Sequence, residues 1–105
     1  MPADADPRLV VVVEFDLAPA TRGEFHRLVL ENAAASLATE PGCRQIDVVI
    51  PEGDSGDRVL LYEIYADAAA FDAHLRTAHF AKFAAEAEPL ALRKTVTRLR
   101  FARVA

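Results

Sequence analysis

The alternation of apolar and polar positions divides the chain into six elements in the order βαββαβ. Residues 9–17 form a nearly continuous apolar run, rich in valine and too short for an ordinary helix, which is typical of a strand covered on both faces. Residues 43–50 and 58–65 are predicted as two more strands, joined as a hairpin by the turn-forming stretch PEGDSGD. Alternation over residues 92–101 predicts the fourth strand.

A helix is predicted over residues 21–39, where Thr21 and Glu24 have the spacing of a capping box. Its apolar positions recur at helical spacing and form one stripe, made of Phe25, Leu28, Val29, Ala33 and Leu37. At about 100° per residue, Asn32 and Ser36 fall inside this stripe and not on the solvated face. Two polar side chains are therefore expected to point inward.

A second helix is expected to follow Asp67, which is placed to cap it, and to continue as far as Pro89 with a kink near Thr77. His74 and His79 lie five residues apart, which separates them by about 140° on one continuous helix. That spacing does not direct two imidazoles to one metal ion, so no metal site is expected unless the helix breaks between them.

The order of elements predicts the fold class. Crossover rules place the first and third strands at the centre of a four-stranded antiparallel sheet, which gives an α+β, ferredoxin-like arrangement. Two helices cover only one face of such a sheet, yet both central strands are apolar on both faces. We expect a second copy of the chain to cover the other face, so that the protein is a homodimer.

Composition and charge limit the partners. The 105 residues, 52% hydrophobic and 27% charged, suit one folded domain over residues 9–105 after a disordered leader at residues 1–8. A net charge of −4 argues against nucleic acid as a partner. The single cysteine, Cys43, fits a reducing compartment, and the cytoplasm is the expected location. Export signals and apolar runs of the roughly 18 residues that a membrane span needs are absent.

The chain contains no glycine-rich phosphate loop, HExxH, CxxC or GxSxG motif, so neither a cofactor nor a metal is expected. The remaining chemistry lies in polar groups within apolar contexts, namely Asn32, Ser36, Tyr62, Glu63, Tyr65, His74 and His79. Asn32 and Ser36 are suited to orient a carbonyl or an oxyanion. The alternative for Ser36 is a hydrogen bond back to the carbonyl oxygen of Asn32.

Glu63 stands in the middle of the third strand and has two interpretations. It is either a general acid or base with a raised pKa, or a structural carboxylate paired with an arginine such as Arg44 or Arg98. His74 is similarly ambiguous, because a histidine on an apolar helix face is either a base in a pocket or a structural residue. The residues alone leave both questions open.

The order and spacing of several short strings resemble a known family. EPGC at residues 40–43, LYEIYAD at residues 61–67 and TAHF at residues 77–80, with Asn32 and Ser36 upstream, are similar to the antibiotic biosynthesis monooxygenase (ABM) domain family. The resemblance covers most of the chain and implies a dimeric ferredoxin-like α/β barrel. It also implies oxygenation of quinols or aromatic polyketides without flavin, haem or metal, in a cavity between the helices and the sheet.

For this chain, the resemblance implies a cofactor-independent monooxygenase acting on a quinol-like or small enolisable carbonyl substrate after proton abstraction. The implied catalytic residues are Asn32, Glu63, His74 and His79, and the implied substrate-binding residues are Ser36, Tyr62, Tyr65 and Phe71. Which of Glu63, His74 and His79 is the base stays open. Two alternatives are an isomerase like the related enzyme that processes phosphorylated autoinducer-2, and a non-catalytic small-molecule binding or stress-response module.

Two positions depart from the family pattern. Ala78 stands where the family commonly has proline, which would soften the helix break that places His79. The chain has no tryptophan, and Tyr65 occupies the place of one that many members carry near the third strand. This second departure counts against the haem-degrading branch of the family.

Overall fold

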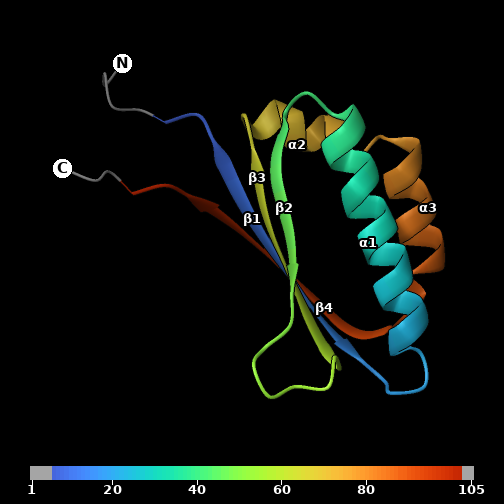
Figure 1. The fold of residues 1–105 in the computed structure, drawn as a ribbon. Helices are drawn as coiled ribbons and strands as arrows, with labels where there is room; N and C mark the ends of the chain where they lie inside the picture. The colour runs from blue at the N-terminus through green and yellow to red at the C-terminus, as the bar shows by residue number, and fades with distance from the viewer. Residues whose placement is uncertain (1–5, 103–105) are drawn as a thin grey trace.

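A computed structural model of the chain describes residues 6–102 and shows one sheet with the helices packed on one of its faces (Figure 1). The elements are β1 (Leu9–Leu17), α1 (Arg22–Thr39), β2 (Cys43–Val49), β3 (Arg58–Tyr65), α2 (Ala68–His74), α3 (Ala78–Glu86), a 3-10 turn (Glu88–Leu90) and β4 (Ala91–Arg100). Of the predicted leader, residues 6–8 have no regular structure and the rest lies outside the described residues. None of these helices is long and apolar enough to cross a membrane.

The sheet is antiparallel, with the strand order β2-β3-β1-β4. The first and third strands are therefore central, and the prediction of an α+β, ferredoxin-like fold is confirmed. Val13 of β1 lies opposite Leu61 of β3 and Val96 of β4, so these three side chains share the face that the helices cover.

The core lies between this inner face and the helices. The inward residues of β1 are all less than a tenth exposed: Val11, Val13, Phe15 and Leu17. The ring of Phe15 lies 4.8 Å from that of Phe25 on α1 and 6.1 Å from that of Phe83 on α3, measured between centroids. Burial of one such phenylalanine contributes about 1.5–3 kcal/mol, so this cluster anchors both helices on the sheet.

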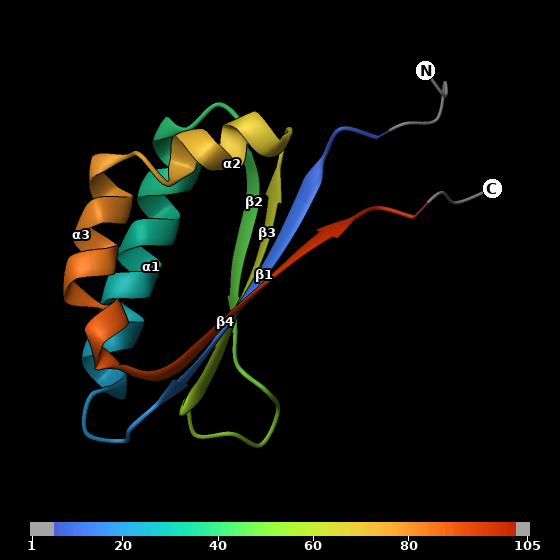
Figure 2. The same ribbon diagram turned by 180° about the vertical axis from the view of Figure 1, so that it is seen from behind.

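The opposite face of the sheet carries no helix within residues 6–102, as the two views of the ribbon show (Figures 1 and 2). Its side chains are nevertheless largely apolar in the central strands, with Val12 on β1 and Leu60 and Ile64 on β3 half-buried. Leu99 of β4, opposite Val10, continues this face and is 45% exposed.

The kink expected near Thr77 is a complete break between two helices. The Oγ1 atom of Thr77 donates a hydrogen bond to the carbonyl oxygen of His74 at 2.8 Å and accepts one from the amide of Phe80 at 3.2 Å. The hydroxyl therefore closes α2 and caps α3, because it satisfies one backbone group at each helix end. The expectation of one kinked helix is corrected accordingly.

Three details of the predicted elements are also corrected. Thr21 precedes α1 but caps it with no side-chain hydrogen bond, and its hydroxyl contacts the carbonyl oxygens of Ala18 and Leu90, so the capping box does not form. Leu37 is 47% exposed because it lies one 100° step from Ser36, which is fully buried. The second strand ends one residue early, at Val49.

Candidate active site

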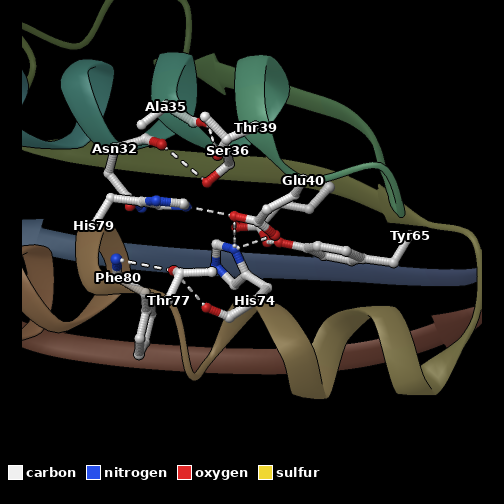
Figure 3. A network of polar contacts seen from close by, with 11 residues as sticks. Asn32, Ala35, Ser36, Thr39, Glu40, Tyr65, His74, Thr77, His79 and Phe80 are labelled. Carbon is white, nitrogen blue, oxygen red and sulfur yellow. Dashed lines mark hydrogen bonds and ion pairs between the residues drawn. The ribbon is translucent and has the colours of Figure 1, made fainter.

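The break between α2 and α3 turns two histidines toward one carboxylate (Figure 3). Nδ1 of His74, the last residue of α2, lies 3.0 Å from Oε2 and 3.1 Å from Oε1 of Glu40. Nε2 of His79, in the first turn of α3, lies 2.5 Å from the same Oε2 atom. A continuous helix would point these two imidazoles apart, so the break at Thr77 makes the cluster.

Glu40 is held at the C-terminal end of α1, where its backbone amide donates to the carbonyl oxygen of Ser36 at 3.0 Å. The following residues turn the chain into β2, and a Cβ atom at Gly42 would clash with the side chain of Ala70 on α2. Gly42 is therefore needed for the close approach of α2 to this turn. Because α2 sits directly on the turn, its last residue reaches the Glu40 carboxylate.

The cluster is largely shielded from water. The side chains of His74, Glu40 and His79 are 4%, 10% and 21% exposed. Burial opposes ionisation of Glu40, but the hydrogen bonds from His74 and His79 outweigh it and lower the pKa of this carboxyl below its ordinary value. Glu40 is thus an acceptor for both rings.

The ring of His74 is fixed in orientation. It stacks on Phe71 at 6.1 Å and lies 5.1 Å from the ring of Phe80 and 5.3 Å from that of Tyr65, between centroids. With Nδ1–H donated to Glu40, the neutral ring carries its lone pair on Nε2. Within residues 6–102, Nε2 has no hydrogen-bond partner, which leaves it able to accept a proton.

A cavity of about 310 Å³ lies between the inner face of the sheet and the helices. Four of the predicted site residues line it: Asn32, Glu63, Phe71 and His74. Its remaining wall is mostly apolar, with Val13 and Leu61 among the residues of the central strands. The cavity therefore brings a histidine, a carboxyl group and a carboxamide together beside mostly apolar side chains.

Glu63 is 4% exposed, and among residues 6–102 its carboxyl group has a hydrogen bond to Tyr65 and no ion pair with Arg44 or Arg98. Its Oε1 atom accepts a hydrogen bond from the hydroxyl of Tyr65 at 2.6 Å. Burial raises the pKa of Glu63 above its ordinary value, although the Tyr65 hydrogen bond acts in the opposite direction. Arg98 instead places its guanidinium 5.3 Å from the centroid of the Phe71 ring.

Asn32 and Ser36 both face inward from α1, as helical spacing predicted, at 7% and 0% exposure. The Ser36 hydroxyl donates to the carbonyl oxygen of Asn32 at 2.9 Å, so the alternative considered for Ser36 is the one observed. The Oδ1 atom of Asn32 is buried and has no hydrogen-bond partner among the described residues. Asn32 is therefore a polar side chain at the cavity wall with bonding capacity unused.

The other predicted site residues lie elsewhere. Tyr62 is half-buried on β3, and alternation along the strand turns it to the uncovered face of the sheet, away from the cavity. Tyr65 is fully buried behind Glu63 and acts as its hydrogen-bond donor. His79 lines a separate small hollow of about 60 Å³ between α1 and α3, which Asn32 and Lys82 also line.

Glu40 and Lys94 were missed as site residues by the sequence reasoning, and Arg98 was considered only as a structural partner of Glu63. Glu40 was interpreted only as part of a helix stop and of the family resemblance, although an acidic residue before Pro-Gly was visible there. Lys94 and Arg98 of β4 line the cavity because they lie opposite Phe15 and Val11 of β1 and so share the inner face. The alternation of Lys94 and Arg98 with Thr95 and Thr97 was the signal in the sequence, because it places the two basic residues on the same face of the strand.

Comparison with known proteins identifies the family. A model of the family described as antibiotic biosynthesis monooxygenase, ABM, matches residues 8–86. A Bacteroides thetaiotaomicron protein of unknown function, described as a possible oxidoreductase, is 25% identical, with a TM-score of 0.84 over 92% of this chain and 100% of its own. Rv0793 of Mycobacterium tuberculosis is also 25% identical, with a TM-score of 0.83 over 93% of this chain and 98% of its own.

A third solved structure, an antibiotic biosynthesis monooxygenase, is 23% identical, covers 90% of this chain and 99% of its own, and has a TM-score of 0.82. At that identity it supports the fold alone. A search of curated sequences finds no match. The family model spans well over half of the chain and includes the cluster at Glu40 and the strand that carries Glu63. The chain belongs to the antibiotic biosynthesis monooxygenase family.

Proposed function

We propose that the protein is a cofactor-independent monooxygenase that acts on a quinol-like or small enolisable carbonyl substrate. The observation that carries the proposal is the cavity of about 310 Å³, in which His74, Glu63 and Asn32 lie beside mostly apolar side chains. That volume lies at the small end of the range typical of ligand pockets, which favours a compact substrate.

His74 is the proposed base. Its Nε2 atom removes a proton next to the substrate carbonyl or from an enol hydroxyl, while the negative charge of Glu40 stabilises the imidazolium that forms. Asn32, on the cavity wall, donates from its Nδ2 amide group to the substrate oxygen on which negative charge develops. Glu63 is the second candidate base, because a carboxylate with a raised pKa accepts a proton more readily near neutral pH.

The oxidation balances without an added reductant. The substrate anion donates electrons to O2, and a carbon–oxygen bond forms at the carbon next to the carbonyl group of an enolate, or at a ring CH ortho or para to the oxygen of a deprotonated quinol. Cleavage of the O–O bond, with loss of the remaining hydrogen from that carbon, then releases one oxygen atom as water. The CH2 group of the carbonyl compound, or the ring CH of the quinol, becomes a carbonyl group, so the substrate itself is the reductant.

Oxygen consumption tests the proposal. Purified protein is incubated with a panel of hydroquinones and 1,3-dicarbonyl compounds, with an oxygen electrode and 18O2 labelling of the product. We expect uptake of one O2 per product and one labelled oxygen in the product. In His74→Gln, turnover should fall by at least about tenfold, which corresponds to about 1.4 kcal/mol in the barrier. Unchanged turnover in a folded His74→Gln variant would remove His74 as the base.

An isomerase of the phosphorylated autoinducer-2 type is the second candidate, favoured by one observation. Arg98 adds positive charge to the cavity wall, and a guanidinium group binds an anionic substituent such as a phosphate. Lys94 also lines the cavity, but it is paired with Glu88. Both reactions begin with proton removal next to a carbonyl, so the same base serves either. Conversion of a phosphorylated dicarbonyl without oxygen uptake would select the isomerase. The third candidate, a non-catalytic small-molecule binding or stress-response module, would bind a ligand in the cavity without turnover of any substrate.

We further propose that two chains associate through the uncovered face of the sheet. The half-buried apolar side chains of β1 and β3 on this face, together with Leu99, would lose contact with water on pairing. A face-to-face dimer leaves the cavity on the helix side of each chain. Each protomer would thus keep its own His74 and Glu63.

A further inference from the structure

We propose that Glu40, His74 and His79 form a binding site for a divalent ion of the zinc class. Their donor atoms, one carboxylate oxygen and two imidazole nitrogens, all lie within 4.8 Å of one another. The sequence argued against such a site only on the condition that one helix carries both histidines. The break at Thr77 removes that condition.

The donor set defines the kind of ion. Imidazole nitrogen with a carboxylate oxygen suits zinc and neighbouring first-row divalent ions, whereas calcium and magnesium prefer oxygen ligands alone. Three protein ligands also leave one position of a tetrahedral ion open to water or another ligand. A single buried carboxylate with two neutral imidazoles leaves an ion's positive charge only half balanced, which favours a further oxygen donor.

Asn32 provides an independent observation at this position. Its Oδ1 atom is buried without a partner, and its side chain extends from α1 toward the ring of His79 (Figure 3). Asn32 and His79 line the same hollow between α1 and α3. An ion bound by His79 and Glu40, or a water molecule on that ion, would supply the partner that this oxygen lacks.

The site is preorganised and reachable. The hydroxyl of Thr77 fixes the ends of both helices, so His74 and His79 are held by backbone that is already ordered. His79 is the most exposed of the three ligands, at 21%, and it faces the hollow between α1 and α3. Lys82 at that hollow is paired with Glu31, so its positive charge is partly neutralised. An ion can therefore approach from the helix side without passing through the larger cavity.

Occupation of the site would switch off the proposed base. An ion on Nδ1 of His74 forces the ring proton onto Nε2, and Nε2 then has no lone pair for the substrate. This consequence rests on the proposed function, whereas metal binding itself does not. Zinc should therefore bind the protein and inhibit its turnover, and a chelator should restore activity.

Isothermal titration of the untagged, chelator-treated full chain with Zn²⁺ tests the site, with Co²⁺ as a spectroscopic probe. We expect one ion per chain and visible d–d absorption bands from Co²⁺ bound in a coordination site of low symmetry. The His79→Gln variant should weaken binding by at least about tenfold and lose the bands. His26→Gln is the matched control, because His26 is the third histidine and contacts Gly56 far from the cluster. Its affinity should stay within about twofold of the wild type, a ratio worth only ~0.4 kcal/mol.

Two results would overturn the proposal. One is the absence of both heat and cobalt bands in the wild-type protein at millimolar metal, a result that needs no variant. The other is equal loss of affinity in His79→Gln and His26→Gln when both have wild-type circular dichroism. Zinc binding without turnover of any substrate would leave the site standing and contradict the proposed function. Turnover that saturating zinc leaves unchanged would contradict the switch.

Discussion

Nδ1 of His74 lies 3.0 Å from Oε2 of Glu40, although the two residues are 34 positions apart in the chain. The contact joins the last residue of α2 to the end of α1. It sets the tautomer of His74, which lines the cavity. The same carboxylate oxygen also accepts a hydrogen bond from Nε2 of His79. Glu40 is therefore the positioning residue for both rings.

Replacement of Glu40 by glutamine should lower kcat by at least about tenfold while KM changes little, because the amide cannot stabilise an imidazolium as a carboxylate does. Steady-state kinetics measures both constants. His26→Gln serves as the control for a histidine interaction outside the cavity. A parallel change in KM and melting temperature with unchanged kcat would show that Glu40 is only structural.

Asn32→Ala should reduce turnover by about tenfold or more and leave the melting temperature unchanged or higher. A buried acceptor without a partner costs on the order of 1–3 kcal/mol, so its removal relieves the fold of a penalty. Thermal melts and kinetics on the same preparation separate these effects. A lower melting temperature with normal turnover per folded molecule would place Asn32 in the packing alone.

Glu63→Gln should stabilise the protein above the pKa of an unfolded glutamate. Because the pKa of Glu63 is raised in the folded state, its contribution to stability is fully present below the unfolded pKa and is lost as pH rises through the folded pKa. The glutamine variant does not ionise, so it does not lose this stability as pH rises. Its side-chain carbonyl can still accept the hydrogen bond from Tyr65. We expect its melting temperature to exceed the wild-type value at about pH 8 and to match it at about pH 4.

The outcome for activity in the same variant separates the two candidate bases. A folded Glu63→Gln protein with full turnover would eliminate Glu63 and leave His74. A gain in melting temperature that is as large at low pH as at high pH would show that ionisation of Glu63 has no part in it.

Thr77→Ala should destabilise the protein by about 1 kcal/mol, the usual loss for a helix cap, which lowers the melting temperature of a domain this size by about 4–8 °C. Thr21→Ala is the matched control, since Thr21 also precedes a helix but makes no side-chain cap hydrogen bond. Differential scanning calorimetry should show a clearly smaller change for the control. Equal losses at the two positions would contradict the role given to the Thr77 hydroxyl.

Leu99→Asp should weaken self-association, because Leu99 lies on the apolar sheet face that we propose as the dimer contact. At 45% exposure the position tolerates a charge without loss of the core. Leu30→Asp on α1, at 56% exposure, introduces the same charge away from the sheet. Light scattering should give twice the chain mass for the wild type and for the Leu30 variant, and a lower mass for the Leu99 variant. A monomeric wild type would contradict the dimer.

The elements and their order could be predicted from local patterns. Apolar runs and helical stripes are periodic signals along a single segment, so β1, α1 and the hairpin were predicted within a residue or two. The βαββαβ order and the crossover rule then leave few sheet arrangements, and the central position of β1 and β3 followed. The inward direction of Asn32 and Ser36 likewise depends only on the helical period.

The composition of the site depends on contacts between distant segments. Glu40 meets His79 across 39 residues, and that meeting requires the helix to stop at Thr77 although the apolar pattern continues through Phe80 and Phe83. Two separate helices are favoured over one continuous helix because the Thr77 hydroxyl satisfies a backbone group at the end of α2 and another at the start of α3. Periodicity gives the direction in which a side chain leaves its own element, but which side chains meet depends on how those elements pack together.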